Sequence, residues 1–186
     1  MKIFDCEFAD LKIVEVDLYH DNRGFFSERF NHEKFSKLGL PTNFLQDNFS
    51  RSKANVIRGM HFQYEKPQGK LVGCLRGKII DVVIDLRANS KTFGQYFSIE
   101  LSDSNGRMLW VPQGFAHGFC VPSDCAEADV LYKVDASYNP KGESGIAFND
   151  KDINIDWTKF GVPNPVFSTR DTDLPSFKSY LENKKF

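Results

Sequence analysis

The sequence lacks an excess of charge of either sign. Its 186 residues include 24 lysines and arginines against 25 aspartates and glutamates, which gives a formal net charge of −1. A chain without a general electrostatic field does not attract nucleic acid or an anionic membrane surface. We therefore expect neither as a partner, and an anionic ligand would have to be held by a local site.

The sequence also lacks a long apolar run near its amino terminus and a closely spaced pair of cysteines. Acidic residues at Asp5, Glu7 and Asp10 interrupt the first stretch, so we expect no signal peptide and no membrane span. Cysteines occur without any Cys-x-x-Cys motif, at Cys6, Cys74, Cys120 and Cys125. Isolated thiols of this kind are typical of buried free cysteines in a cytoplasmic protein, which is the location that we expect.

Motifs of several common enzyme classes are missing as well. There is no phosphate-binding loop, no glycine fingerprint for a dinucleotide and no nucleophile elbow, which disfavours kinase chemistry, hydride transfer and serine hydrolysis. A metal site in a β-barrel usually needs a His-x-His pair with a carboxylate and a further histidine. Because His61 is followed by Phe62-Gln63, we expect no metal.

Phenylalanine, by contrast, is abundant, and short stretches of alternating apolar and polar residues recur. The 18 phenylalanines bring the aromatic content to 14%, which favours a thick β-type core over a helical bundle. The length fits one domain over residues 1–186, without a linker or repeat. Many short strands at regular spacing predict an all-β antiparallel sandwich or barrel of the jelly-roll type.

The alternation and the capping residues predict the individual elements. Strands are expected at residues 12–18, 24–30, 70–76, 78–85, 97–101, 108–111 and 128–134. The two runs on either side of Gly77 are expected to form a hairpin. Asn31 is expected to cap a short helix that ends at Leu38, before Gly39, and residues 176–185 are expected to be helical.

One part of the chain concentrates groups suited to proton transfer. Arg58 and His61 follow each other closely in VIRGMHFQ (56–63), and Lys70 ends PQGK (67–70). An imidazole that titrates near neutrality, with cations close by, suits a site that moves protons on an anionic substrate. Taken singly, however, His61 is better explained as a hydrogen-bonded structural histidine, and Lys70 and Arg58 as solvated surface charges.

Three further residues have both a structural and a functional explanation. His117 lies between glycines in GFAHG (114–118), so it could be a buried histidine with both ring nitrogens hydrogen-bonded. Tyr132 alternates with apolar neighbours, as a core tyrosine does. Asp171 is expected in a loop. No single residue decides the function.

Together, an ordered series of motifs covers almost the whole chain. The series comprises DNRGFFSE (21–28), LQDN (45–48), RGMHFQ (58–63), PQGKLV (67–72), DVVIDLR (81–87), FG (93–94), WVPQGFAHGF (110–119), LYK (131–133) and STRD (168–171). With these motifs in this order, the sequence resembles the dTDP-4-dehydrorhamnose 3,5-epimerase family, whose members are cupin-type sugar-nucleotide epimerases.

The resemblance implies a fold, an assembly and a set of catalytic roles. It implies a cupin-type jelly roll with a few short peripheral helices, in a homodimer whose amino-terminal strands cross between subunits. It also implies that no cofactor is needed. His61 would be the general base, oriented by Asp171; Lys70 would stabilise an enolate oxygen, and Tyr132 would be the general acid on the opposite face of the sugar.

The resemblance further implies a nucleotide-sugar substrate. Arg58 and the partner subunit's Arg23 would bind the diphosphate through their forked donors. The other residues that would contact the substrate are Phe26, Glu28, Gln46, Asn48, His117, Tyr138, Glu143 and Arg170.

The implied reaction inverts C-3 and C-5 of a dTDP-4-keto-6-deoxyhexose, in the formation of dTDP-L-rhamnose. Three alternatives are a mono-epimerase that acts at C-3 or C-5 only, a sugar-nucleotide-binding cupin without turnover, and a metal-dependent oxygenase or isomerase. The chain differs from many family members at Ser137, where a tyrosine is common, and at Gly73, where an arginine is frequent. Both differences bear on the nucleotide and on the carbon that is epimerised.

Overall fold

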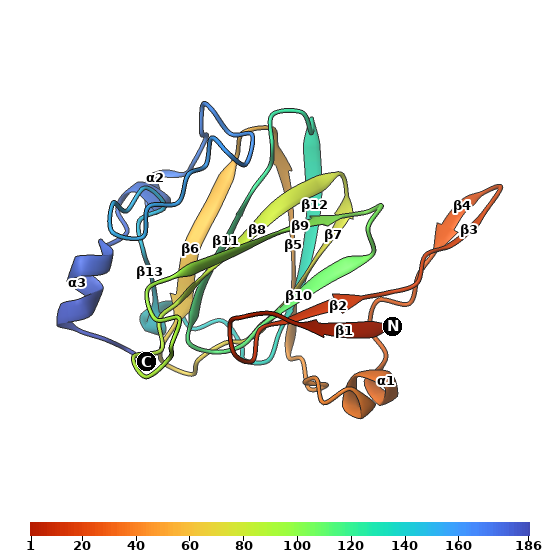
Figure 1. Cartoon of the computed structure of the whole chain (residues 1–186), viewed down its shortest axis with the longest axis horizontal. Helices are drawn as coiled ribbons and strands as arrows, with labels where there is room; N and C mark the ends of the chain where they lie inside the picture. The colour runs from red at the N-terminus through yellow and green to blue at the C-terminus, as the bar shows by residue number, and fades with distance from the viewer.

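Two antiparallel sheets and a separate hairpin form the framework of the computed structural model, which describes residues 1–186 (Figure 1). In spatial order, the six-stranded sheet consists of β1 (Lys2–Asp5), β2 (Lys12–Glu15), β10 (Arg107–Val111), β7 (Lys70–Arg76), β12 (Glu127–Val134) and β5 (Gln46–Lys53). The five-stranded sheet consists of β13 (Glu143–Gly145), β6 (Ile57–Gln63), β11 (Phe115–Cys120), β8 (Lys78–Asp85) and β9 (Tyr96–Ser102). The hairpin pairs β3 (Tyr19–Asp21) with β4 (Gly24–Phe26). The predicted all-β sandwich is confirmed.

The main core lies between the two sheets. Val72 and Val130 enter it from the six-stranded sheet, and Val83 and Phe119 enter it from the five-stranded sheet. Successive side chains of a strand point to opposite faces, so the neighbours of these residues are on the outer faces. Burying one such side chain stabilises the fold by roughly 1.5–3 kcal/mol.

The outer face of each sheet is covered by a different part of the chain. Met60 and Val82, on the outer face of the five-stranded sheet, belong to a cluster with Trp157 and with Phe177 of helix α3 (Phe177–Glu182). This carboxyl-terminal segment lies along one side of the molecule in Figure 1. On the six-stranded sheet, Phe35 of α1 (His32–Lys37) packs in a further cluster beside β2 and β10.

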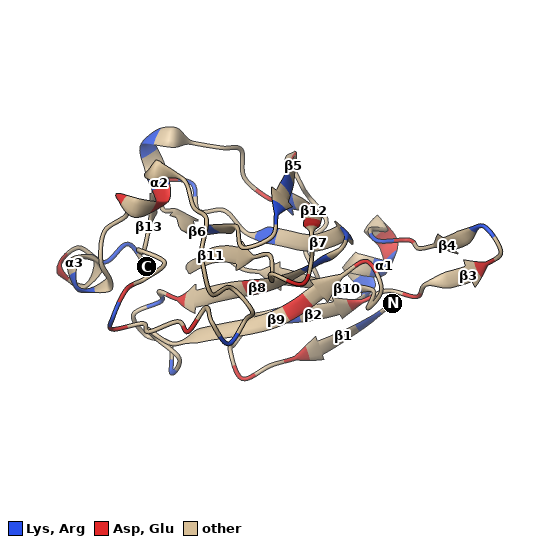
Figure 2. Cartoon of the chain, turned by 90° about the horizontal axis from the view of Figure 1, so that it is seen from above, with Lys and Arg blue, Asp and Glu red and all other residues tan.

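The short helices follow their capping residues. Asn31 accepts a hydrogen bond from the backbone N–H of Lys34 at 3.1 Å and begins α1, as predicted. Ser176 caps α3 in the same way. None of the helices is long and apolar enough to cross a membrane. Figure 2 shows basic and acidic residues interspersed along the chain.

The hairpin predicted around Gly77 is wrong, although both strands have the predicted bounds. β7 pairs with β10 and β12, whereas β8 pairs with β11 and β9, so the turn carries the chain from one sheet to the other. A single residue is too short for the two-residue loops that join paired strands. Gly77 has φ +72°, and a Cβ there would lie 2.5 Å from the carbonyl oxygen of Glu127, so the turn requires glycine. The strand predicted over 24–30 also ends early, at Phe26.

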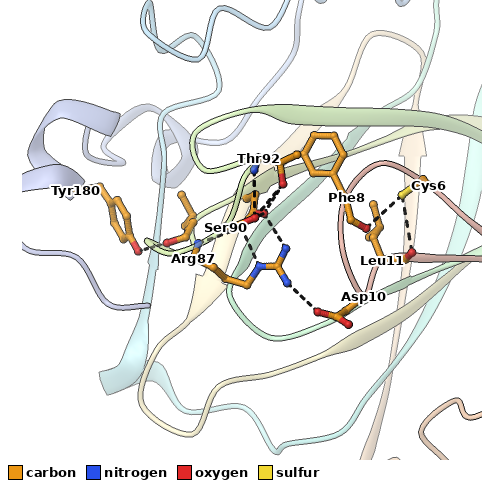
Figure 3. A network of polar contacts seen from close by, with 10 residues as sticks. Cys6, Phe8, Asp10, Leu11, Arg87, Ser90, Thr92 and Tyr180 are labelled. Atoms are coloured by element: carbon orange, nitrogen blue, oxygen red, sulfur yellow. Dashed lines mark hydrogen bonds and ion pairs between the residues drawn. The ribbon is translucent and has the colours of Figure 1, made fainter.

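A buried carboxylate, that of Asp85, fixes the chain where β8 ends; Figure 3 labels its partners Arg87, Ser90 and Thr92. Asp85 is inaccessible to solvent and accepts hydrogen bonds from Arg87 Nε at 2.9 Å and Nη2 at 2.7 Å, Ser90 Oγ at 2.6 Å and Thr92 Oγ1 at 2.7 Å. Arg87 also contacts Asp10 at 3.2 Å. Burial opposes ionisation of Asp85, but these donors outweigh it and lower the pKa of its carboxyl group.

We expect Asp85→Asn to lower the free energy of unfolding by about 3 kcal/mol at pH 7, because it leaves buried donors of Arg87 without a charged partner. A carboxyl group whose pKa is lowered by folding stabilises the protein above its unfolded pKa, and this contribution disappears as the pH falls through the folded value. The variant should therefore lose less stability on acidification than the wild type does. Urea unfolding at pH 7 and pH 4 measures both effects.

The matched control is Asp124→Asn, which removes an exposed ion pair with Lys78. We expect the control to change stability by less than about 0.5 kcal/mol. Equal losses for the two variants would contradict a special role of the Asp85 network.

Candidate active site

A cavity of about 560 Å³ opens between the two sheets. Most of the predicted site residues line it, namely Gln46, Asn48, Arg58, His61, Lys70, His117, Tyr132, Tyr138, Glu143, Arg170 and Asp171. The other lining residues are Phe49, Ser50, Gln68, Gly118, Phe119 and Ser168. The cavity thus gathers segments that are distant in the sequence.

The register of the six-stranded sheet explains why this part of the interior is polar. Asn48 lies opposite Tyr132, and Tyr132 lies opposite Val72, so the three side chains share one face. Lys70 is two residues from Val72 and therefore points the same way. The inner face changes from apolar at Val72 and Val130 to polar at Lys70 and Tyr132, which leaves a polar wall beside the core.

His61 and Asp171 are hydrogen-bonded across 110 positions of the sequence. His61 Nε2 lies 2.7 Å from Asp171 Oδ1, and the Asp171 side chain is only 5% exposed. Because a carboxylate accepts a hydrogen bond, this contact favours the tautomer with its proton on Nε2 and leaves Nδ1 as the basic nitrogen. The pair has the form of an oriented general base.

Asp171 is held by a short helix that the sequence did not predict. The residue lies in α2 (Thr169–Thr172), not in a loop, and forms a capping box with Ser168. Ser168 Oγ donates to Asp171 Oδ2 at 2.7 Å. Burial opposes ionisation of Asp171, but the hydrogen bonds from His61 and Ser168 outweigh it and lower the pKa of the carboxyl group. The His61 imidazole is thus bonded to a carboxylate in a fixed orientation.

Lys70 is buried in the cavity wall. Its side-chain Nζ donates to the carbonyl oxygen of His61 at 3.2 Å, and the residue is 8% exposed. Desolvation by burial lowers the pKa of Lys70 to about 8, while the negative charges of Asp81 and Glu143 oppose this shift. The ammonium is therefore charged at neutral pH and has N–H groups free for an oxygen atom of a ligand.

His117 lies directly opposite His61 in the ladder between β6 and β11. Its Nε2 is 2.9 Å and 3.1 Å from the two carboxylate oxygens of Asp81, and both side chains are buried. Burial lowers the pKa of His117, although Asp81 opposes this shift. The ring is therefore neutral at pH 7 and donates its Nε2 proton to Asp81.

Two glycines allow β6 and β11 to approach each other at this point. A Cβ on Gly59 would lie 2.6 Å from Cα of Gly118, and one on Gly118 would lie 2.5 Å from the carbonyl oxygen of Arg58. The ladder is irregular between His117 and Phe119. Only glycine fits at both positions, and the contact fixes how the two histidines are presented to the cavity.

Tyr132 faces the histidines from the other sheet. It extends from β12, whereas His61 and His117 extend from β6 and β11, so the hydroxyl and the imidazoles belong to opposite walls of the cavity. Burial, followed by the charge of Glu143, raises the pKa of Tyr132. The phenol therefore carries its proton at neutral pH.

Charged residues line the same cavity on β13, α2 and β6. Glu143 forms an ion pair with Arg170 and accepts a hydrogen bond from the Tyr138 hydroxyl at 2.7 Å. Arg58 Nε donates to Ser52 Oγ at 2.9 Å, which ties β6 to β5. An anionic ligand would meet two arginines here, which agrees with the expectation of a local anion site.

Three predicted substrate-binding residues, Arg23, Phe26 and Glu28, do not line the cavity of their own chain. Arg23 lies in the hairpin β3–β4, which extends away from the sandwich in Figure 1, and it binds Asp21 through its backbone N–H at 2.8 Å. Phe26 is 69% exposed. Glu28 pairs with Lys34 at 2.6 Å.

Sequence reasoning missed some residues that support the site. Ser168 could have been found, because a serine three positions before an acidic residue is a capping signature. Asp81 begins the DVVIDLR motif (81–87), but nothing in the sequence assigned it a role, since it looks like any polar residue of a strand. Nowhere in the chain do three histidine, cysteine or carboxylate side chains form a group that could hold a metal ion.

Comparison with known proteins gives a consistent result. Residues 5–179 match a family model described as dTDP-4-dehydrorhamnose 3,5-epimerase. The enzyme of that name from Escherichia coli K12 is 47% identical to this chain, in an alignment that covers 94% of this chain and 93% of the relative. The enzyme of that name from Methanothermobacter thermautotrophicus is 48% identical, and its alignment covers 86% of this chain and 85% of the relative.

Solved structures agree with this result. A crystal structure of dTDP-6-deoxy-D-glucose-3,5-epimerase from Legionella pneumophila, in complex with dTDP-4-keto-L-rhamnose, is 40% identical and has a TM-score of 0.89. The similarity covers 95% of this chain and 93% of that chain. The predicted family is therefore confirmed: the chain belongs to the dTDP-4-dehydrorhamnose 3,5-epimerase family.

Proposed function

We propose that the chain is an epimerase that inverts C-3 and C-5 of a dTDP-4-keto-6-deoxyhexose, without a cofactor, in the formation of dTDP-L-rhamnose. The observation that carries this proposal is the cavity in which the His61–Asp171 pair, the buried Lys70 ammonium and the Tyr132 hydroxyl come together. Each group matches one requirement of the reaction. Family membership and the named relatives support the same function.

The keto group of such a substrate makes both inversions accessible to one site. C-3 and C-5 flank the carbonyl at C-4, so loss of a proton from either carbon places the negative charge on the same oxygen. A single ammonium, that of Lys70, can stabilise both enolates. In a partly desolvated cavity such a charge supplies several kcal/mol of stabilisation.

Inversion needs a base and an acid on opposite faces of the ring. His61 takes the proton, and Asp171 stabilises the imidazolium that forms. Tyr132, from the opposite wall, returns a proton to the other face. General acid–base assistance of this kind contributes roughly 10²–10⁴-fold to the rate.

The nucleotide half of the substrate requires cations, hydrogen-bonding groups and an aromatic surface. Arg58 and Arg170 are the arginines of the cavity, and Gln46 and Asn48 present amides from β5. Tyr138, which is half exposed and bonded to Glu143, offers a ring that a base can stack on. We assign the diphosphate to Arg58, and the base and ribose to the side of the cavity formed by β5 and Tyr138.

We also propose that the active enzyme is a homodimer in which the hairpin β3–β4 crosses to the partner. Arg23, Phe26 and Glu28 do not line their own cavity, and Tyr19, Phe25 and Phe26 of the hairpin are exposed. Exposed aromatic residues on an isolated two-stranded ribbon are typical of a segment that packs against another chain. We further propose a cytoplasmic location, because all four cysteines are free, as is usual in the reducing cytoplasm.

A mono-epimerase would use the same base and the same enolate. We therefore expect solvent deuterium at both C-3 and C-5 when the protein turns over dTDP-4-keto-6-deoxyglucose in deuterated water, as measured by NMR or mass spectrometry. Deuterium at only one carbon would replace the proposal with a mono-epimerase. No incorporation at either carbon would contradict catalysis on this substrate.

His61→Ala should abolish deuterium exchange at every position, because the other histidine of the cavity, His117, is buried and its pKa is lowered by that burial. A rate loss of at least about 10³-fold is expected from removing the general base. The control is His32→Ala, an exposed histidine at the start of α1, which should exchange at the wild-type rate. Substantial residual exchange in His61→Ala would identify another base.

Mixed dimers test whether Arg23 serves the partner's site. Arg23→Ala and His61→Ala should each be nearly inactive alone. After co-refolding of equal amounts, half of the dimers contain both variants, and one of their two sites is intact, so activity should return to about a quarter of the wild-type value. Co-refolding of His61→Ala with Lys70→Ala is the control, since every site then lacks one group and no activity returns. Failure of the first mixture to recover would show that Arg23 does not act across the dimer.

A further inference from the structure

The Lys70 ammonium is buried without a carboxylate at ion-pair distance. Its one hydrogen bond is to a neutral carbonyl oxygen, that of His61, at 3.2 Å. The two carboxylates that act on its charge are Asp81 and Glu143. Glu143 is already bound to Arg170 and Tyr138, so its charge is largely compensated. Asp81 remains as the uncommitted negative charge.

Asp81 lies beneath the cavity rather than on its surface. It is fully buried on β8 and is absent from the cavity wall, so it does not touch a bound ligand. No lysine or arginine pairs with it; its hydrogen-bond partner is the neutral imidazole of His117. A buried carboxylate without a cation in contact is costly in a β-sandwich core, which indicates that the charge has a use.

Lys70 and Asp81 contact the two paired strands, β6 and β11, that carry the histidines of the cavity: Lys70 contacts the backbone of His61, and Asp81 binds the side chain of His117. Lys70 enters from β7 and reaches the backbone of His61, which is paired with His117 across the ladder. His117 in turn holds Asp81 with its Nε2 proton. Lys70 and His117 thus line the same cavity, and Asp81 is bound to His117 behind the cavity wall, in an interior where charges are weakly screened.

We propose that Asp81, bound to His117 behind the cavity wall, is a positioning residue that acts as the counter-charge of Lys70 and keeps the ammonium protonated for the enolate oxygen. This inference rests on the proposed epimerase function. It adds a group that does not contact the substrate. It also gives the buried His117–Asp81 pair a role distinct from that of the His61–Asp171 pair.

The pH dependence of Lys70 reports on this role. The titratable or charged groups around the ammonium are Asp81 on β8, His117 on β11, His61 on β6, Tyr132 on β12, Glu143 on β13, Asp171 and Arg170 on α2, and Arg58 on β6. The pKa of Lys70 is about 8, so the wild-type rate should fall as the pH rises through this value and the ammonium loses its charge. Removing the charge of Asp81 should move this alkaline limb to lower pH.

The experiment compares the pH profiles of kcat for deuterium exchange in the wild type and in Asp81→Asn. Asparagine can still accept the hydrogen bond from His117, so the substitution removes the charge and keeps the contact. We expect the alkaline limb to shift downward by about one pH unit, with the acidic limb unchanged. Asp81→Glu restores the charge and should return the limb toward its wild-type position.

Asp85→Asn is the matched control. Asp85 is an equally buried carboxylate on the same strand, four residues further on, but it is bound to Arg87 and is absent from the cavity wall. Its substitution should leave the alkaline limb in place. An unmoved limb in folded Asp81→Asn, or an equal shift in Asp85→Asn, overturns the inference while leaving the epimerase function intact, because the wild-type profile tests that function separately.

If Asp81→Asn is too unstable to assay, a double-mutant cycle with Lys70→Met replaces the kinetic test. Once the buried cation is gone, the loss of its counter-charge should lower the thermal midpoint less than it does in the wild type. Equal decreases in the two backgrounds would show that Asp81 and Lys70 are not coupled and would overturn the inference.

Discussion

A lysine ammonium held between two β-sheets is the constraint on which the rest of the site depends. Removing such a charge from water costs several kcal/mol, and an apolar sandwich core offers nothing in return. Lys70 lies in a polar wall beside the core. This wall consists of amides and hydroxyls on alternate residues of β5 and of the histidines of β6 and β11. The same wall supplies the groups that the proposed reaction needs. The polar groups that lower the cost of burying the Lys70 ammonium are therefore the same groups that a bound nucleotide sugar would contact.

The carboxyl-terminal segment links the stability of the fold to the assembly of the site. Its residues Trp157, Phe177 and Tyr180 pack on the outer face of the five-stranded sheet, and between them the chain delivers Asp171 to His61. Until that face is covered, the imidazole has no carboxylate to orient it. The His61–Asp171 pair therefore depends on this packing, and a substitution in the outer-face cluster, away from the cavity wall, would disturb the orientation of the imidazole.

The sequence was sufficient for the all-β class, for several strands and two helices, and for most of the residues that line the cavity, and it was insufficient for the remaining elements and for the topology. Alternation gave the bounds of β7 and β8, yet their pairing was mispredicted, because whether a turn at Gly77 joins neighbours or crosses between sheets depends on Glu127 and other distant residues. The family resemblance identified His61, Lys70, Tyr132 and Asp171 as a group, which no spacing rule could do across 110 positions. Asp81 was not assigned a role, because it neither lines the cavity nor pairs with a lysine or arginine. Its proposed effect on Lys70 depends on how the two strands lie in space, which no spacing in the sequence reveals.

The hairpin β3–β4 exposes aromatic side chains to solvent, and nothing in its own chain buries them. Tyr19 and Phe26 are 61% and 69% exposed on a ribbon with no third strand, an arrangement that is marginally stable in water. In the proposed dimer the same side chains would be buried against the partner. Each cavity would also gain the partner subunit's Arg23, whereas the Arg23 of its own chain does not line it. Dimerisation would then do two things at once: it would cover apolar surface and complete the anion site. Because both depend on one segment, a monomer would be deficient in stability and in substrate binding together, and selection for activity would maintain the interface.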